Sequence, residues 1–186
     1  AAAAVLVLVI GIGTTGVGGP KRIVEMVEQA VGGRQVSKVN NSKKSAKTID
    51  NEVEEQAYQE IKDQLGFEPA RIIAVDKEMI YEYSEIDADM QMAQLLYKFG
   101  DANVSYIMSI PYYEELMGSD LEDDVTNRYD FEEGKLKAKV TEYELPESKK
   151  KRYSATFEYQ GVYYQLIGTI EKADFEEILK KLHFPS

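Results

Sequence analysis

The C-terminal stretch from Lys151 to Phe184 constrains the fold more than any other part of the chain. Two runs rich in aromatic and β-branched residues, 152–159 and 162–170, flank Gln160-Gly161. Because glycine adopts the positive φ that a tight turn needs, this pattern predicts a β-hairpin. The residues that follow have the apolar spacing of one helical face, which predicts a helix over 172–182. The apolar positions of this helix are Phe175, Ile178, Leu179 and Leu182.

Composition bounds the size of the fold and its partners. A chain of 186 residues that is 44% hydrophobic is long enough for one well-buried domain with an appendage. The formal charge of −11 repels phosphate backbones, so we expect no nucleic-acid partner. The chain contains no cysteine, which excludes disulfides, thiolate zinc sites and cysteine nucleophiles.

Residues 1–19 are apolar and carry no charged side chain. Their number is close to the roughly 20 residues that span a bilayer, so we expect the end of a membrane helix or of a signal anchor. A strand inside the folded domain is an alternative. A third reading is a dinucleotide-binding loop, because Gly11, Gly13 and Gly16 form a G-x-G-x-x-G motif after an apolar run. Pro20 and the missing acidic residue after the next apolar run, 35–39, weaken this reading.

Residues 20–47 separate this segment from the folded domain. Apolar residues at helical spacing from Ile23 to Val31 predict a short juxtamembrane helix, and the lysine-rich stretch 37–47 predicts an exposed linker. We therefore divide the chain into an apolar segment over 1–19, a juxtamembrane helix and linker over 20–47, and an α+β domain over 48–186.

The domain begins with a predicted helix over residues 51–65. Its expected apolar face consists of Val53, Ala57, Ile61 and Leu65, and Gly66 supplies a C-terminal cap.

Alternating apolar residues after this helix predict strands over 71–75, 78–86, 90–99, 104–110 and 134–145. Residues 111–131 have no clear period and predict an irregular, acidic section. Its acidic residues lack the glycine and glutamate that an EF-hand requires, so a solvated loop is favoured over a calcium site. With the hairpin, the expected fold is α+β, an antiparallel sheet of about six or seven strands packed with helices.

Aromatic and methionine side chains along these strands form a candidate ligand or partner face. The candidate residues are Tyr97, Tyr106, Met108, Tyr159 and Tyr164. Core packing of one sheet face against helices is the competing interpretation, because it explains such stripes without a ligand.

Catalytic motifs are missing from the sequence. His183 is the single histidine, and its place at the end of the last predicted helix suits a charge at the helix C-terminus better than a general base. No serine lies in a G-x-S-x-G motif, which would mark a catalytic nucleophile. A zinc site would have to rest on carboxylates, which alone form poor structural zinc sites. We therefore expect a non-enzymatic domain without catalytic residues, metal or cofactor.

The helix ending in Gly66-Phe67-x-Pro69 and the pattern Tyr153-x-Ala-x-Phe-x-Tyr-x-Gly161-x-x-Tyr164-x-Leu-x-Gly168 resemble domain-of-unknown-function family 4367. The similarity covers about residues 48–184. The chain departs from many members in carrying Phe157 and Tyr159 where they have tryptophan near the hairpin. The family is known from Gram-positive, especially clostridial, membrane proteins. The resemblance implies one membrane helix, an extracytoplasmic α+β domain likened to anti-sigma-factor or lipoprotein-carrier-like sensors, and no catalytic residues.

Three functions follow as hypotheses. The first is an extracytoplasmic sensing or protein-interaction domain of a single-pass membrane protein. Its partner would be an unidentified protein or a small apolar ligand. The second is a carrier that holds a lipid or other apolar ligand against the sheet. The third is a nucleotide-dependent enzyme that uses Gly11 to Gly16.

Overall fold

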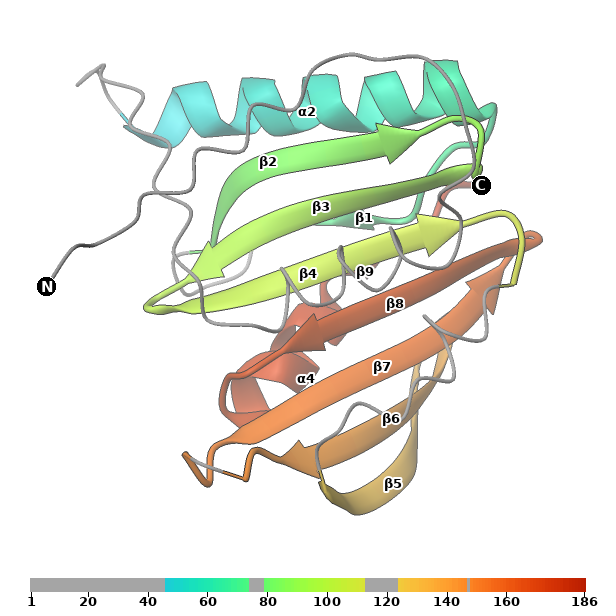
Figure 1. Cartoon of the computed structure of the whole chain (residues 1–186). Coiled ribbons are helices and arrows are strands. Elements are labelled where there is room, and N and C mark those ends of the chain that lie inside the picture. The colour runs from blue at the N-terminus through green and yellow to red at the C-terminus, as the bar shows by residue number, and fades with distance from the viewer. Residues whose placement is uncertain (1–45, 74–78, 113–123, 147) are drawn as a thin grey trace, which may run out of the picture.

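The computed structural model describes residues 46–73, 79–112, 124–146 and 148–186. These residues form an α+β domain with two helices and nine strands within the described ranges (Figure 1). The helices are α2 (Ala46–Leu65) and α4 (Lys172–Lys180). The strands are β1 (Arg71–Ile72), β2 (Met79–Asp87), β3 (Met92–Phe99), β4 (Ala102–Ser109), β5 (Asp124–Glu133), β6 (Leu136–Glu144), β7 (Lys151–Tyr159), β8 (Val162–Gly168) and β9 (Leu182–His183).

Seven of the strands form one antiparallel sheet in the order β2-β3-β4-β8-β7-β6-β5. The predicted antiparallel sheet of six or seven strands is thus confirmed for this part of the chain. The last long strand, β8, lies between β4 and β7, where Tyr106 of β4 faces Leu166 of β8. The C-terminal hairpin therefore joins the β2–β4 meander to the β5–β7 meander.

The predicted hairpin is confirmed, with β7 and β8 as its arms. Its two turn residues, Gln160 and Gly161, have φ angles of 51° and 78°. Positive φ at both positions is the signature of the tight turn whose twist matches that of the flanking strands. The turn fixes the register of β8, and hence the position of every β8 side chain relative to β7.

Substitution of Gly161 by alanine is expected to lower the free energy of unfolding by about 1 kcal/mol, because a side chain is disfavoured at positive φ. The matched change Gln160→Asn is expected to have the opposite sign and a smaller size, since asparagine tolerates this conformation. Urea unfolding of both variants measures the two effects. Equal destabilisation by both changes would contradict the role assigned to the turn.

Both helices pack on one face of the large sheet, and the two-stranded sheet β1-β9 lies on the same side (Figure 1). Apolar side chains from β3, β4, β6, β7 and β8 meet the helices there and form the core. The predicted apolar side of the last helix is confirmed, since Phe175, Ile178 and Leu179 are buried. The helix itself ends at Lys180, two residues earlier than predicted, and Leu182 lies in β9.

Helix α2 begins earlier than the predicted helix and ends where predicted. Gly66 has a φ of 78° and its N–H donates to the Lys62 carbonyl oxygen at 2.9 Å, so the C-terminal cap is confirmed. The prediction for Val53 was wrong, because this side chain is 45% exposed. Tyr58 is buried instead, three and seven residues before the buried Ile61 and Leu65.

The opposite face of the central strands is also buried, and it is more polar. The Gln94 side-chain amide donates to Ser105 Oγ at 2.7 Å, and the Gln165 amide donates to Ser154 Oγ at 3.0 Å. Met92 lies on this face, opposite Ser109 of β4. The sheet therefore carries buried side chains on both faces.

The prediction that residues 111–131 are irregular was partly wrong. Residues from Asp124 onward form β5, which pairs with β6 over its whole length with one irregularity between Val125 and Asn127. Exposed polar side chains on β5 hide the apolar alternation from which strands are predicted.

Several sequence-based predictions lie outside the described residues. They are the apolar segment 1–19 with its glycine motif, the helix within 20–31, the linker 37–45 and the acidic residues 120–123. Within the described ranges, neither α2 nor α4 combines the length and apolar character that crossing a bilayer requires.

Candidate functional site

Four buried tyrosines and one glutamate gather where α2, β1 and the large sheet meet. We call this group the tyrosine cluster, and it consists of Glu54, Tyr58, Tyr97, Tyr106 and Tyr164. The cluster contacts the extended segment that follows α2. The Ala70 N–H donates to the Tyr164 hydroxyl at 3.2 Å, and the Tyr106 hydroxyl donates to the Ala70 carbonyl oxygen at 3.0 Å.

The tyrosine hydroxyls occupy the place that a neighbouring strand would take. Along its other edge, β1 pairs with β9, and the Ile73 N–H donates to the Lys181 carbonyl oxygen at 3.0 Å. Buried backbone groups must be paired, and among the described strands β1 has one partner, β9. The hydroxyls of Tyr106 and Tyr164 satisfy the buried backbone of Ala70 on the side without a strand.

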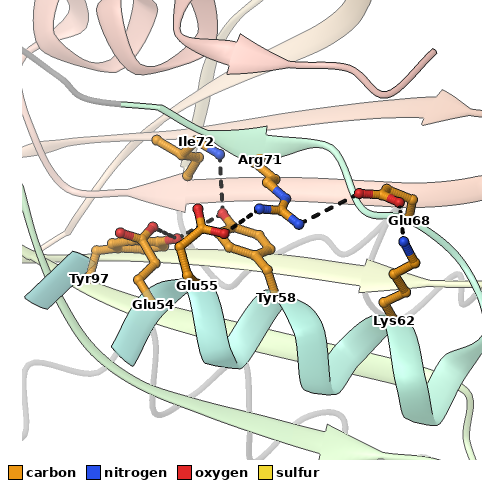
Figure 2. Close-up of polar contacts among 8 residues, drawn as sticks. All are labelled: Glu54, Glu55, Tyr58, Lys62, Glu68, Arg71, Ile72 and Tyr97. Carbon is orange, nitrogen blue, oxygen red and sulfur yellow. Dashed lines mark hydrogen bonds and ion pairs between the residues drawn. The ribbon is translucent and has the colours of Figure 1, made fainter. Parts of the chain in front are cut away.

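A chain of hydrogen bonds continues from β1 into α2 (Figure 2). The Ile72 N–H donates to the Tyr58 hydroxyl at 3.1 Å, the hydroxyls of Tyr58 and Tyr97 lie 3.0 Å apart, and the Tyr97 hydroxyl donates to Glu54 at 2.8 Å. Since Tyr97 gives its one hydrogen to Glu54, Tyr58 donates to Tyr97. Three elements, β1, β3 and α2, are therefore linked by one directed chain.

Charged side chains surround the outer side of the cluster. The Arg71 guanidinium lies 2.6 Å from Glu55 and 3.6 Å from Glu68, and it stands over the Tyr58 ring at 5.2 Å from the ring centroid. Lys62 approaches Glu68 from α2 (Figure 2). Because the glutamates are well exposed, these pairs stabilise the fold weakly and chiefly orient Arg71 over the aromatic ring.

Burial keeps the tyrosines of the cluster protonated. It raises the pKa of Tyr58, Tyr97 and Tyr106 well above the ordinary value, and it raises the pKa of Tyr164 to about 12. These hydroxyls therefore act as neutral hydrogen-bond donors and acceptors at physiological pH, and not as ionised nucleophiles.

Glu54 is the titratable end of the chain of hydrogen bonds. Burial raises the pKa of its carboxyl above the ordinary value of 4.5, and the hydrogen bond from Tyr97 opposes that rise. The folded protein thus holds the Glu54 proton to a higher pH than the unfolded chain does. The free energy of unfolding must then fall as pH rises from the unfolded pKa to the folded pKa.

Substitution Glu54→Gln is expected to reduce this loss of stability, because glutamine has no proton to release and still offers an oxygen to Tyr97. Urea unfolding at a series of pH values above about 4 measures the slope. The exposed α2 residue Glu60 provides the control, and Glu60→Gln is expected to keep the wild-type slope. An unchanged slope in Glu54→Gln would contradict the assigned burial of the carboxyl.

The five residues predicted as a ligand or partner face are divided between two places. Tyr97, Tyr106 and Tyr164 belong to the tyrosine cluster, and Met108 is buried on the same sheet face. Tyr159 lies apart at the hairpin end, half-buried, where its hydroxyl donates to the Pro185 carbonyl oxygen at 2.7 Å. The predicted contact of these residues with a ligand or partner stays a prediction.

Sequence reasoning missed two members of the cluster, Glu54 and Tyr58. The signal for Tyr58 was its position in the i, i+3, i+7 pattern with Ile61 and Leu65, which a helical wheel would have placed on the buried side. Glu54 gave no signal, because glutamate near a helix start is ordinarily explained by the helix dipole.

His183 lies in β9, where it is exposed and pairs with Arg71 in the backbone register. Within the described part of the chain, no three histidine, aspartate or glutamate side chains are placed to bind one metal ion.

Comparison with protein families matches residues 71–182 to the domain of unknown function DUF4367. These residues make up more than half of the 186-residue chain. The chain belongs to the DUF4367 family. No curated protein and no solved structure matches it. The DUF4367 match begins at β1, later than the expected start at residue 48, so Glu54 and Tyr58 of α2 precede the matched region while their partners lie within it.

Proposed function

We propose that this chain is the sensing or protein-interaction domain of a membrane-anchored regulator of the anti-sigma-factor-like kind, and that it is not an enzyme. The observation that carries the proposal is the hydrogen-bonded chain from the Ile72 N–H through Tyr58 and Tyr97 to Glu54. This chain of hydrogen bonds connects the DUF4367 sheet to α2, the first described element after the proposed anchor segment 1–19 and the linker that follows it.

A change at the sheet can reach α2 through these contacts. If a partner displaces β1 or β3, then Tyr58 and Tyr97 lose their hydrogen-bond geometry, and Glu54 loses a partner that helps to offset its burial. The free energy of holding α2 in its observed position then changes. Contacts of this kind support a two-state coupling between a partner site on the sheet and the N-terminal side of the domain.

The carrier hypothesis has no comparable support. The aromatic and methionine side chains that would line a ligand site pack against α2, α4 and one another, as in the stacked rings of Phe157 and Tyr164 at 4.9 Å. The carrier therefore stays a prediction, which native mass spectrometry for a co-purified lipid can test.

Fractionation of the native protein from its own cells tests the proposed anchoring. Recovery in the carbonate-washed membrane pool, with the domain cleaved by protease added outside intact cells, would support an extracytoplasmic domain. Recovery in the cytosol would contradict the proposal.

Photo-cross-linking in the same cells tests whether α2, the receiving end of the proposed coupling, contacts a further protein. A photoreactive residue at Gln56, an exposed position of α2, is expected to give a discrete adduct, whereas the same residue at the exposed Lys180 of α4 serves as the control. Identical adduct patterns at the two positions would argue against a specific partner at α2.

A further inference from the structure

Strand β5 is a long edge strand of the large sheet. It has ten residues, lies last in the strand order, and pairs on one side with β6 (Figure 1). No described strand pairs with its other side. Edge strands expose unpaired backbone groups that another chain can pair with, so the side chains around this edge decide which partner is accepted.

The backbone groups that point away from β6 belong to alternate residues around Arg128. The Arg128 N–H donates to the Asn127 side-chain oxygen at 2.9 Å, so this N–H is not used by the β5–β6 ladder. In an antiparallel strand, neighbouring residues direct their backbone groups to opposite sides. The groups directed away from β6 are therefore those of Arg128, Asp130 and Glu132, and among them the Arg128 N–H is paired with the Asn127 side chain.

We propose that two copies of this chain associate through antiparallel pairing of β5 with β5, around a two-fold axis at Tyr129. In this register Arg128 of each copy stands opposite Asp130 of the other. In each such pair the Asp130 N–H meets the Arg128 carbonyl oxygen of the second copy. The Arg128 N–H exchanges the Asn127 side-chain oxygen for the Asp130 carbonyl oxygen of the second copy. The pair of Arg128 with Asp130 occurs twice in the dimer, because the two-fold axis relates the two copies.

Neighbouring registers are disfavoured by charge. In an antiparallel pair, two residues that stand opposite each other place their side chains on the same face of the sheet. The other registers allowed for two β5 strands therefore move the two-fold axis from Tyr129 to a neighbouring residue. An axis at Arg128 places two arginines opposite each other, and an axis at Asp130 does the same for two aspartates. The axis at Tyr129 is the one among these three that places no like charges opposite each other. The axis at Asp130 also brings Arg128 opposite Glu132, but it sets two aspartates face to face.

The β6 strand extends the same complementarity. Lys139 faces Asp130 in the β5–β6 register, and both side chains are exposed. Across the proposed interface the row then runs Lys139, Asp130 and Arg128 of the second copy, with alternating sign. This arrangement offsets part of the repulsion that the net charge of −11 imposes on association.

Analytical ultracentrifugation of the full chain over a range of concentrations, in one detergent throughout, tests the proposal. Wild type is expected to show a concentration-dependent dimer. Asp130→Arg and Arg128→Asp are each expected to weaken dimerisation by roughly tenfold or more, because each places like charges opposite one another twice. The double variant R128D/D130R restores opposite charges and is expected to recover wild-type dimerisation.

The control is Glu158→Arg on β7, which changes net charge by the same amount as Asp130→Arg at an exposed position away from the edge. It is expected to dimerise at least as well as wild type. A monomeric wild type, an unaffected Asp130→Arg, or a double variant that stays monomeric would each overturn the proposal.

A cysteine at the axis separates this interface from association through other segments. The chain has no native cysteine, so oxidation of Tyr129→Cys is expected to give a disulfide-linked dimer, while Glu158→Cys stays monomeric. Equal cross-linking of the two variants would contradict an axis at Tyr129.

Discussion

Replacement of Phe175 by alanine is expected to lower the free energy of unfolding by about 3–5 kcal/mol, the range for truncation of a buried phenylalanine. Phe175 is fully buried and is the largest side chain that α4 places in the core. Its ring lies 5.5 Å from the ring of Tyr153 on β7. The alanine variant leaves a cavity between α4 and the hairpin, and urea unfolding followed by circular dichroism measures the loss.

The matched control on α4 is Lys180→Ala. This side chain is exposed, and exposed substitutions usually change stability by about 0.5 kcal/mol or less. A loss at Phe175 no larger than the loss at Lys180 would show that α4 does not dock on the sheet as described.

Removal of the Tyr106 hydroxyl by Tyr106→Phe is expected to lower the free energy of unfolding by about 1–3 kcal/mol, the penalty for a buried polar group left without a partner. The ring keeps its packing in this variant, whereas the Ala70 carbonyl oxygen loses its donor at a fully buried position. Chemical denaturation at neutral pH measures the change, because the Tyr106 hydroxyl is protonated there.

Tyr163→Phe provides the control for this prediction. Tyr163 lies on the opposite sheet face, half-buried, where its ring contacts Tyr112 at 5.2 Å. Loss of its hydroxyl is expected to change stability by less than about 0.5 kcal/mol. Equal effects of the two variants would remove the special role given to the Ala70 contact.

Local patterns in the sequence predicted much of the sheet. The Gln160-Gly161 turn and the one-sided alternation of Leu136, Ala138 and Val140 depend on neighbours in the chain, and both are confirmed. The position of β8 between β4 and β7 could not be predicted in this way, because it depends on pairing between strands far apart in the sequence.

The tyrosine cluster shows a second limit. The aromatic stripe of Tyr97, Tyr106 and Tyr164 was visible as a pattern, and its burial followed from the core interpretation. The hydroxyl partners were not visible, because they are backbone groups of a segment whose position only the folded structure fixes. Tyrosine differs from phenylalanine at such sites by one hydroxyl, and that hydroxyl commonly finds a partner when buried.

Native-state hydrogen exchange of the Ala70 and Ile72 amides tests the central claim most directly, namely that tyrosine hydroxyls connect β1 to the sheet and to α2. The account predicts slow exchange at both amides in the full chain, and selective loss of protection at Ile72 in Tyr58→Phe while Ala70 stays protected by Tyr164. Exchange at Ala70 and Ile72 as fast as at exposed amides, or equal protection of Ile72 with and without the Tyr58 hydroxyl, would contradict it.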